Sequence, residues 1–205
     1  MKRAILSLLF LILFNTCFGQ TYSFDRLIKS EVSTTSAKHK ENTYLFNSED
    51  YSYSLRLNEG KDSTEAWIID TKRRQVHYFN AERKDSLELK FVKTNPYKLN
   101  LPEYTYEFSY VKSKSREKEI LLAIIDKEKK EIASYRLKIE KTDHNYFPIF
   151  QATAAVEPFN LMNIKAPFNF LVLKSNGKNS NGKAVNYELS CTEGTELMVT
   201  IPQKS

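Results

Sequence analysis

The sequence predicts a mainly β fold: a single antiparallel, strongly twisted sheet or half-barrel, with one short N-terminal helix. Aromatic residues make up 13% of the chain, with 12 Tyr and 13 Phe against one Trp, and such side chains are enriched in strands. Apolar and polar residues alternate with the period of two that is typical of half-buried strands. The segment Ile68-Ile69-Asp70, followed by a basic turn, recurs as Ile124-Ile125-Asp126, which indicates a β-meander used twice.

Residues 1–19 have the pattern of a cleaved secretory signal peptide. Lys2 and Arg3 form a charged start, and an apolar run covers residues 4–14. This run is too short to cross a bilayer, because a membrane-spanning helix needs about 20 residues. We therefore expect cleavage after Gly19.

The mature chain, residues 20–205, is expected to be one exported β-rich domain, periplasmic or extracellular. No second apolar run of membrane length follows, so no transmembrane span is predicted. The alternative is a lipid anchor at Cys17, although the residues before it resemble a lipoprotein-processing signal poorly. After cleavage only Cys191 remains, so no intrachain disulfide is expected.

The charge balance argues against nucleic acid as a partner. The 31 basic and 25 acidic residues give a formal net charge of +6. Without Lys2 and Arg3, 29 basic residues remain against 25 acidic ones, so the mature chain carries +4. This small excess permits attraction to anionic surfaces, but it differs from the strongly basic balance of nucleic-acid-binding domains.

The first predicted element after the leader is a short helix over residues 24–32. Phe24 and Ile28 have helical spacing, and Ser23 can act as the N-cap. We expect the apolar face of this helix to pack on the sheet. The polar residues 33–42 that follow are predicted to form a loop.

Two β-meanders are then predicted, in residues 43–91 and 97–141. Each begins with a strand of alternating aromatic and polar residues and continues into a hairpin with a basic turn. A meander with one apolar face cannot bury that face alone. The two copies must therefore face each other, share one curved sheet, or both cover the helix.

The C-terminal part returns to strands after an irregular stretch. Residues 143–165 include Pro148 and Pro158 and are predicted to form a short helix or a crossing loop. Further strands are expected within residues 168–201, and Asn181-Gly182 favours a hairpin between the first two of them.

The nearest approach to a catalytic motif is GKNSNGKA, residues 177–184, which resembles the phosphate-binding P-loop. Ala184 stands where a hydroxyl residue should hold magnesium, and an alternating strand follows instead of a helix, so a plain hairpin loop is predicted. His39, His77 and His144 lack the paired spacing of metal ligands, and His77 is expected at the surface or at a sheet edge. We therefore predict no catalytic residues, no metal site, no cofactor and no enzyme activity.

Six aromatic residues lie in strands near the start of the two meanders. In a closed sandwich they would be core. In an open half-barrel they would line a concave groove for an amphipathic ligand such as lipid, because tyrosine combines an apolar ring with a hydroxyl that requires a partner. Half-barrel lipoprotein carriers offer an analogy at the level of fold, without a shared sequence motif. The six residues are Tyr51, Tyr53, Tyr104, Tyr106, Phe108 and Tyr110.

Basic residues are concentrated in the turns of the two repeated hairpins. If the repeats stack side by side, both turns emerge at the same rim and can contact an anionic surface. The alternative is that these cations only keep solvated turns soluble. The residues are Lys72, Arg73, Arg74, Lys127, Lys129 and Lys130.

Together these patterns predict an exported, non-enzymatic protein of the cell envelope, with lipid or another envelope protein as its partner. One hypothesis is a binding module that takes an amphipathic ligand on the aromatic face. The other is an interaction or structural component with a closed core and no small-molecule ligand. A continuous apolar groove would favour the first hypothesis, and a filled core the second.

Overall fold

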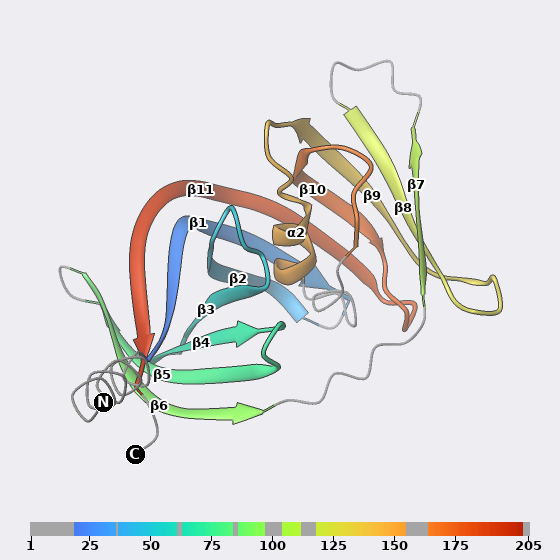
Figure 1. Cartoon of the computed structure of the whole chain (residues 1–205). Coiled ribbons are helices and arrows are strands. Elements are labelled where there is room, and N and C mark those ends of the chain that lie inside the picture. The colour runs from blue at the N-terminus through green and yellow to red at the C-terminus, as the bar shows by residue number, and fades with distance from the viewer. Residues whose placement is uncertain are drawn as a thin grey trace, which may run out of the picture.

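The computed structural model describes residues 19–35, 37–60, 63–83, 86–96, 104–111, 118–154 and 164–202. This part of the chain is mainly β, with 69% strand, and it forms eleven antiparallel strands in one sheet and one short helix (Figure 1). The sheet is not closed into a barrel. The predicted single antiparallel sheet is therefore confirmed. Export and lipid anchoring stay predictions, because residues 1–18 lie outside the described residues.

The strand order is β6-β5-β4-β3-β2-β1-β11-β10-β9-β8-β7, so β6 and β7 are the two edges. Neighbouring strands are antiparallel throughout, which suits short connections between consecutive strands. The strands are β1 (Gln20–Thr34), β2 (Ala37–Phe46), β3 (Tyr53–Glu59), β4 (Thr64–Asp70), β5 (Gln75–Arg83), β6 (Leu87–Pro96), β7 (Thr105–Tyr110), β8 (Lys118–Ile125), β9 (Glu131–Lys141), β10 (Phe170–Lys178) and β11 (Ala184–Ile201).

The predicted N-terminal helix is wrong, because residues 24–32 lie in strand β1. Phe24, Ile28 and Val32 are buried along this strand. A spacing of four residues fits one face of a helix, but it equally fits one face of a strand, whose period is two. These residues form a strand because they pair with β11 on one side and with β2 on the other, and tertiary contacts of this kind override a weak local preference for helix.

The predicted loop over residues 33–42 is also replaced by strand, because β1 continues to Thr34 and β2 begins at Ala37. Glu31 pairs with Glu41, and Ser30 pairs with Asn42. Backbone pairing of the two strands thus continues through residues whose polar side chains suggested a loop.

The long strands β1 and β11 connect the two halves of the sheet. Their pairing runs from Gln20 opposite Ile201 to Thr34 opposite Val185, with register shifts at two places. Such bulges increase the local bend and twist of a strand. In Figure 1, β1 and β11 arch together, and the helix α2 (Phe147–Thr153) lies on the concave side of the arch. A short helix was one of the two structures predicted for this stretch.

The two predicted meanders are present as β3-β4-β5 and β7-β8-β9, and they share one sheet. Ile68 and Ile124 occupy corresponding positions, and neither side chain is exposed to solvent. Asp70 and Asp126 each open the following turn by accepting backbone hydrogen bonds, from Arg73 N (2.7 Å) and from Lys130 N (3.0 Å) respectively. The copies lie toward opposite ends of the sheet, separated by β2, β1, β11 and β10.

The GKNSNGKA stretch forms the hairpin between β10 and β11, as predicted. The Asn179 carboxamide oxygen accepts hydrogen bonds from Asn181 N (3.1 Å) and Lys183 N (3.0 Å), and Gly182 adopts a φ of 72°. No helix follows that could hold a phosphate, because β11 begins at Ala184.

The buried apolar residues form three clusters. One joins β8, β9 and β10 to the helix, one lies between β3, β4, β5 and the outer ends of β1 and β11, and a small one joins β1 and β2 to Ile149 of α2. Strand β2 contributes to two of them, because Tyr44 and Phe46 belong to the small cluster while Leu45 belongs to the second. Alternate side chains of a strand point to opposite faces, so both faces of β2 are covered.

A buried polar cluster lies between β1, β4 and β5. The Tyr22 hydroxyl donates to Asp70 Oδ2 (2.8 Å) and lies 2.8 Å from His77 Nε2. Arg73 Nη1 donates to the same carboxylate (3.0 Å), and His77 Nδ1 lies 2.7 Å from the Thr94 hydroxyl. His77 is only 1% exposed, so its predicted position at the surface or at an edge is wrong. Its partners satisfy both ring nitrogens, which makes burial tolerable.

Candidate functional site

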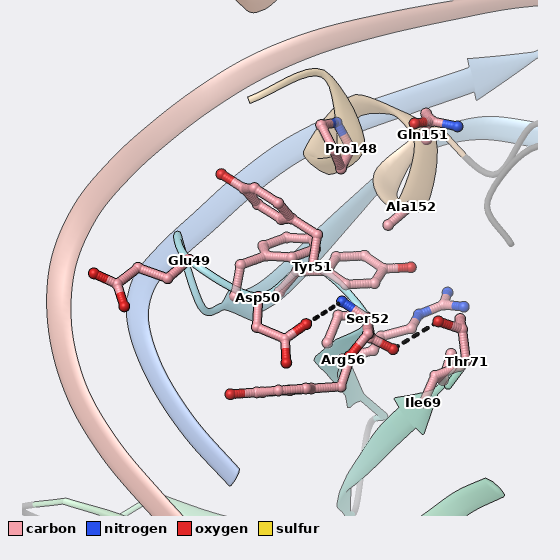
Figure 2. A pocket seen from close by; sticks show the side chains of 14 residues that line it. Glu49, Asp50, Tyr51, Ser52, Arg56, Ile69, Thr71, Pro148, Gln151 and Ala152 are labelled. Carbon is pink, nitrogen blue, oxygen red and sulfur yellow. Dashed lines mark hydrogen bonds between the residues drawn. The ribbon is translucent and has the colours of Figure 1, made fainter. Parts of the chain in front are cut away.

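A cavity of about 370 Å³ lies between the helix and strands β2, β3 and β4, and we call it the helix pocket. Figure 2 shows Pro148 and Ala152 of α2 on one side of it and Arg56, Ile69 and Thr71 on the other. The lining residues are Tyr44, Phe46, Glu49, Asp50, Tyr51, Ser52, Tyr53, Ser54, Arg56, Ile69, Thr71, Pro148, Gln151 and Ala152.

The turn between β2 and β3 holds Tyr51 at the pocket, and side-chain hydrogen bonds fix this turn. The Asn47 carboxamide oxygen accepts from Glu49 N (2.9 Å), and Asn47 Nδ2 donates to the Tyr53 hydroxyl (2.9 Å). Asp50 Oδ1 accepts from Ser52 N (2.9 Å), one of the contacts drawn in Figure 2. Asx-type bonds of this kind define a turn locally, so Tyr51 is presented by an ordered segment.

The helix is anchored by its buried residues, which leaves the face with Pro148, Gln151 and Ala152 against the pocket. Phe147 and Phe150 pack into the cluster of β8, β9 and β10, and Ile149 packs with Tyr44 and Phe46. Each of these three anchors is at most 3% exposed. The helix therefore forms a fixed wall of the pocket.

Polar groups inside the pocket lack partners. The Tyr51 hydroxyl and Arg56 Nε are buried and have no hydrogen-bond partner among the described residues. Burial raises the pKa of Tyr51 above its ordinary value, and the nearby Tyr146 and Asp25 add to this shift. Burial also raises the pKa of Tyr44, and Arg56 opposes that shift. Both tyrosines are therefore neutral hydroxyls at physiological pH, able to donate a hydrogen bond.

A second cavity, of about 510 Å³, lies on the other face of β2, and we call it the leucine pocket. Leu45 lines it, whereas the neighbouring residues Tyr44 and Phe46 line the helix pocket. The two cavities are thus separated by the sheet itself. The leucine pocket is lined by Leu27, Leu45, Leu57, Leu87 and Leu197, with Glu59, Thr64, Ser86, Thr195 and Glu196.

The six aromatic residues selected from the sequence are divided between two places. Tyr51 and Tyr53 line the helix pocket. Tyr104, Tyr106 and Phe108 pack against the cluster of β8, β9 and β10, and burial raises the pKa of Tyr106 to about 12. Tyr110 is 70% exposed and stacks on Phe168, with ring centroids 5.9 Å apart. Neither cavity brings Tyr51 and Tyr53 together with Tyr104 and Tyr106.

The two basic turns lie at opposite ends of the strands. Neighbouring strands of an antiparallel sheet run in opposite directions. Six strands lie between β4 and β8 in the sheet, so β4 and β8 themselves run in opposite directions. The turn with Lys72, Arg73 and Arg74 therefore does not share a rim with the turn that carries Lys127, Lys129 and Lys130. Contact of either turn with an anionic surface stays a prediction.

Several pocket residues were not selected from the sequence. Tyr44 and Phe46 carry the signal that could have found them, since they alternate on a strand as Tyr51 and Tyr53 do. Arg56 was passed over as an ordinary polar residue of an alternating strand. Pro148, Gln151 and Ala152 carry no such signal, because their contribution depends on where α2 docks.

Two kinds of feature are absent from the described part of the chain. No helix there is long and apolar enough to cross a membrane. No group of three or more His, Cys, Asp or Glu side chains among these residues is placed to hold a metal ion.

Neither a protein-family model nor a curated protein matches the chain. Among solved structures, it is similar to a LolA superfamily protein from Nitrosomonas europaea, with 7% sequence identity, a TM-score of 0.36, and coverage of 85% of this chain and 87% of that one. It is also similar to a putative outer membrane lipoprotein-sorting protein domain from Vibrio parahaemolyticus, with 10% identity, a TM-score of 0.21, and coverage of 84% and 86%. Because identities and TM-scores are this low, function has to be inferred from the chain's own residues.

Proposed function

We propose that this chain is an exported, non-enzymatic binding protein of the cell envelope that holds an amphipathic ligand, such as a lipid, in the helix pocket. The observation that carries the proposal is the pocket itself. It combines aromatic walls with a partly buried arginine, and among the described residues Arg56 Nε and the Tyr51 hydroxyl have no hydrogen-bond partner. The pocket therefore offers apolar and polar surface to the same ligand.

The chemistry of the lining supports an amphipathic ligand over a wholly polar or wholly apolar one. Tyr44 and Phe46 on the sheet side, with Pro148 and Ala152 on the helix side, provide apolar contacts. Arg56 provides a polar contact within the same cavity. The volume of about 370 Å³ lies at the small end of the range for ligand pockets, about 300–1,000 Å³. It suits a single alkyl chain with its head group.

Filling the pocket tests this function. In a calorimetric titration with dodecanoate, the wild-type protein should bind saturably. Ala152→Trp should weaken binding about tenfold or more, because the larger side chain takes up space that the ligand needs. Leu197→Phe, which fills part of the leucine pocket instead, is the matched control and should leave the affinity unchanged.

The controls separate the alternatives. Loss of binding in Leu197→Phe with no loss in Ala152→Trp would place the ligand in the leucine pocket and contradict the helix pocket. Absence of saturable binding to the wild-type protein would favour the other hypothesis, an interaction or structural component without a small-molecule ligand.

A further inference from the structure

We infer that the helix pocket selects amphiphiles with an anionic head group, and that Arg56 is the residue that binds this group. The inference rests on the proposed function, because it names the ligand class of the same pocket. It depends on three observations: Arg56 lies between two aromatic rings, its guanidinium has no ion-pair partner among the described residues, and the acidic residues of the pocket are exposed.

Arg56 is held in a row of aromatic side chains that crosses the sheet. It pairs with Tyr44 of β2 and with Trp67 of β4. Its guanidinium carbon lies 5.7 Å from the centroid of each ring. Cation–π contacts on both sides fix the orientation of a guanidinium group. Arg56 thus presents a preoriented charge to the pocket that it lines.

No carboxylate among the described residues forms an ion pair with Arg56. Within the described part of the chain, its guanidinium donates from Nη2 to the amide oxygen of Asn42, at 3.4 Å. Among the residues that the structure describes, Nε has no hydrogen-bond partner, and the ion pairs found there do not involve Arg56. A partly buried cation without a counter-ion is unfavourable, and an anion that enters the pocket removes this cost.

The acidic residues of the pocket do not take the place of that anion. Asp50 is exposed, and its carboxylate accepts a hydrogen bond from Ser52 N (2.9 Å). Glu49 is exposed as well and points away from the other labelled side chains in Figure 2. Exposed charges of this kind are screened by solvent, so they leave the partly buried Arg56 as the stronger influence on a bound ligand.

The geometry of a guanidinium narrows the ligand to a carboxylate or a phosphate. A guanidinium presents a planar fork of N–H donors that matches two oxygens of either group, whereas a neutral hydroxyl offers only one oxygen.

The test compares three ligands that share one alkyl chain: dodecanoate, dodecyl phosphate and dodecanol. Calorimetric titration of the wild-type protein should give tighter binding for at least one anion than for dodecanol by about tenfold or more, since a hydrogen bond to a charged group contributes about 1.5–3 kcal/mol. The anion that binds more tightly identifies the head group. This comparison requires no variant and so does not depend on how a substitution affects folding.

Variants then assign the preference to Arg56. Arg56→Gln should remove the anion preference, because it weakens binding of the anions more than binding of dodecanol. Arg56→Lys should restore part of the preference, because it keeps the charge but loses the fork. Arg136→Gln, on β9 with an exposed side chain, makes the same charge change away from the pocket and should have no effect.

Three outcomes are informative. Equal affinity for the anions and for dodecanol in the wild-type protein would overturn this inference and leave the proposed function standing. Equal loss of all three ligands in Arg56→Gln would also overturn it, since Arg56 would then only shape the pocket. Failure of all three ligands to bind the wild-type protein would overturn the proposed function together with this inference.

Discussion

The buried cluster of Tyr22, Asp70 and His77 links the stability of the fold to pH. Burial alone would raise the pKa of Asp70, but hydrogen bonds from the Arg73 backbone, from Tyr22 and from the Arg73 side chain outweigh burial and lower it. Burial lowers the pKa of His77. Both shifts have the same sign, so the unfolded state binds more protons than the folded state as pH falls.

We therefore predict that acid destabilises the protein in two steps. The contribution of His77 is fully present above its unfolded pKa of about 6.5 and is lost as pH falls below it, and that of Asp70 is lost below about pH 4. Urea unfolding measured from pH 8 to pH 3.5 checks this. His77→Gln should flatten the first step and Asp70→Asn the second, whereas His144→Gln, an exposed control, should change neither. A wild-type stability that stays constant between pH 8 and pH 5 would contradict the role of His77.

Two hairpin turns provide an internal comparison of backbone conformation. In both, the fourth residue donates its N–H to the carbonyl of the first, at 3.0 Å for Lys129 to Asp126 and 2.8 Å for Gly182 to Asn179. Both fourth residues have positive φ, 65° for Lys129 and 72° for Gly182. A side chain is unfavourable in this left-handed region by about 1–2 kcal/mol, and glycine is not.

Lys129→Gly should therefore raise the free energy of unfolding by about 0.5–1 kcal/mol, which is less than the full strain because glycine also gains freedom in the unfolded chain. The reverse change, Gly182→Lys, should lower it by a similar amount. Both values come from chemical denaturation. If Lys129→Gly destabilised the protein, the turn would have to depend on the Lys129 side chain.

Among the elements, α2 decides whether the helix pocket exists, and Ile149 attaches it to β1 and β2. Ile149 is 1% exposed and packs with Ile28, Tyr44 and Phe46. Ile149→Ala should lower the free energy of unfolding by about 2–4 kcal/mol, as expected for a truncated core side chain. Ile132→Ala, at a half-buried position of β9, should cost less. Both are measured by urea denaturation.

The same substitution should also affect the pocket. A helix that has lost its anchor on β2 no longer holds Pro148 and Ala152 against the ligand, so Ile149→Ala should weaken dodecanoate binding more than Ile132→Ala does. Equal affinity in the two variants would show that the docking of α2 does not shape the ligand site.

Strands β1 and β2 are the elements that the sequence patterns do not predict. The period of two in residues 51–57 predicts β3 correctly, and the basic turn between two apolar stretches in residues 65–79 predicts β4 and β5. In β1, the spacing of Phe24 and Ile28 fits both the period of a helix and the period of a strand. In β2, the polar residues from Lys40 to Asn42 pair with β1, and this pairing depends on a partner strand that local composition does not show.

For the molecule as a whole, the sequence predicts a single antiparallel sheet but not the order of the strands within it. The repeat indicates two meanders, yet it contains no information that places them toward opposite ends of an eleven-stranded sheet. That arrangement follows from β1 and β11, which pair over nearly their whole length although they lie at opposite ends of the described chain. The predicted aromatic face is divided for this reason, and the helix pocket retains only Tyr51 and Tyr53 of it.

The central claim is that the folded protein carries an amphipathic ligand in the helix pocket. Native mass spectrometry of the protein purified from its own cell envelope tests this most directly. We predict an added mass corresponding to one acidic amphiphile per chain, present in the wild-type protein and in Leu197→Phe, and absent from Ala152→Trp. Recovery of the bare wild-type chain, or of the chain bound only to another protein, would contradict the claim.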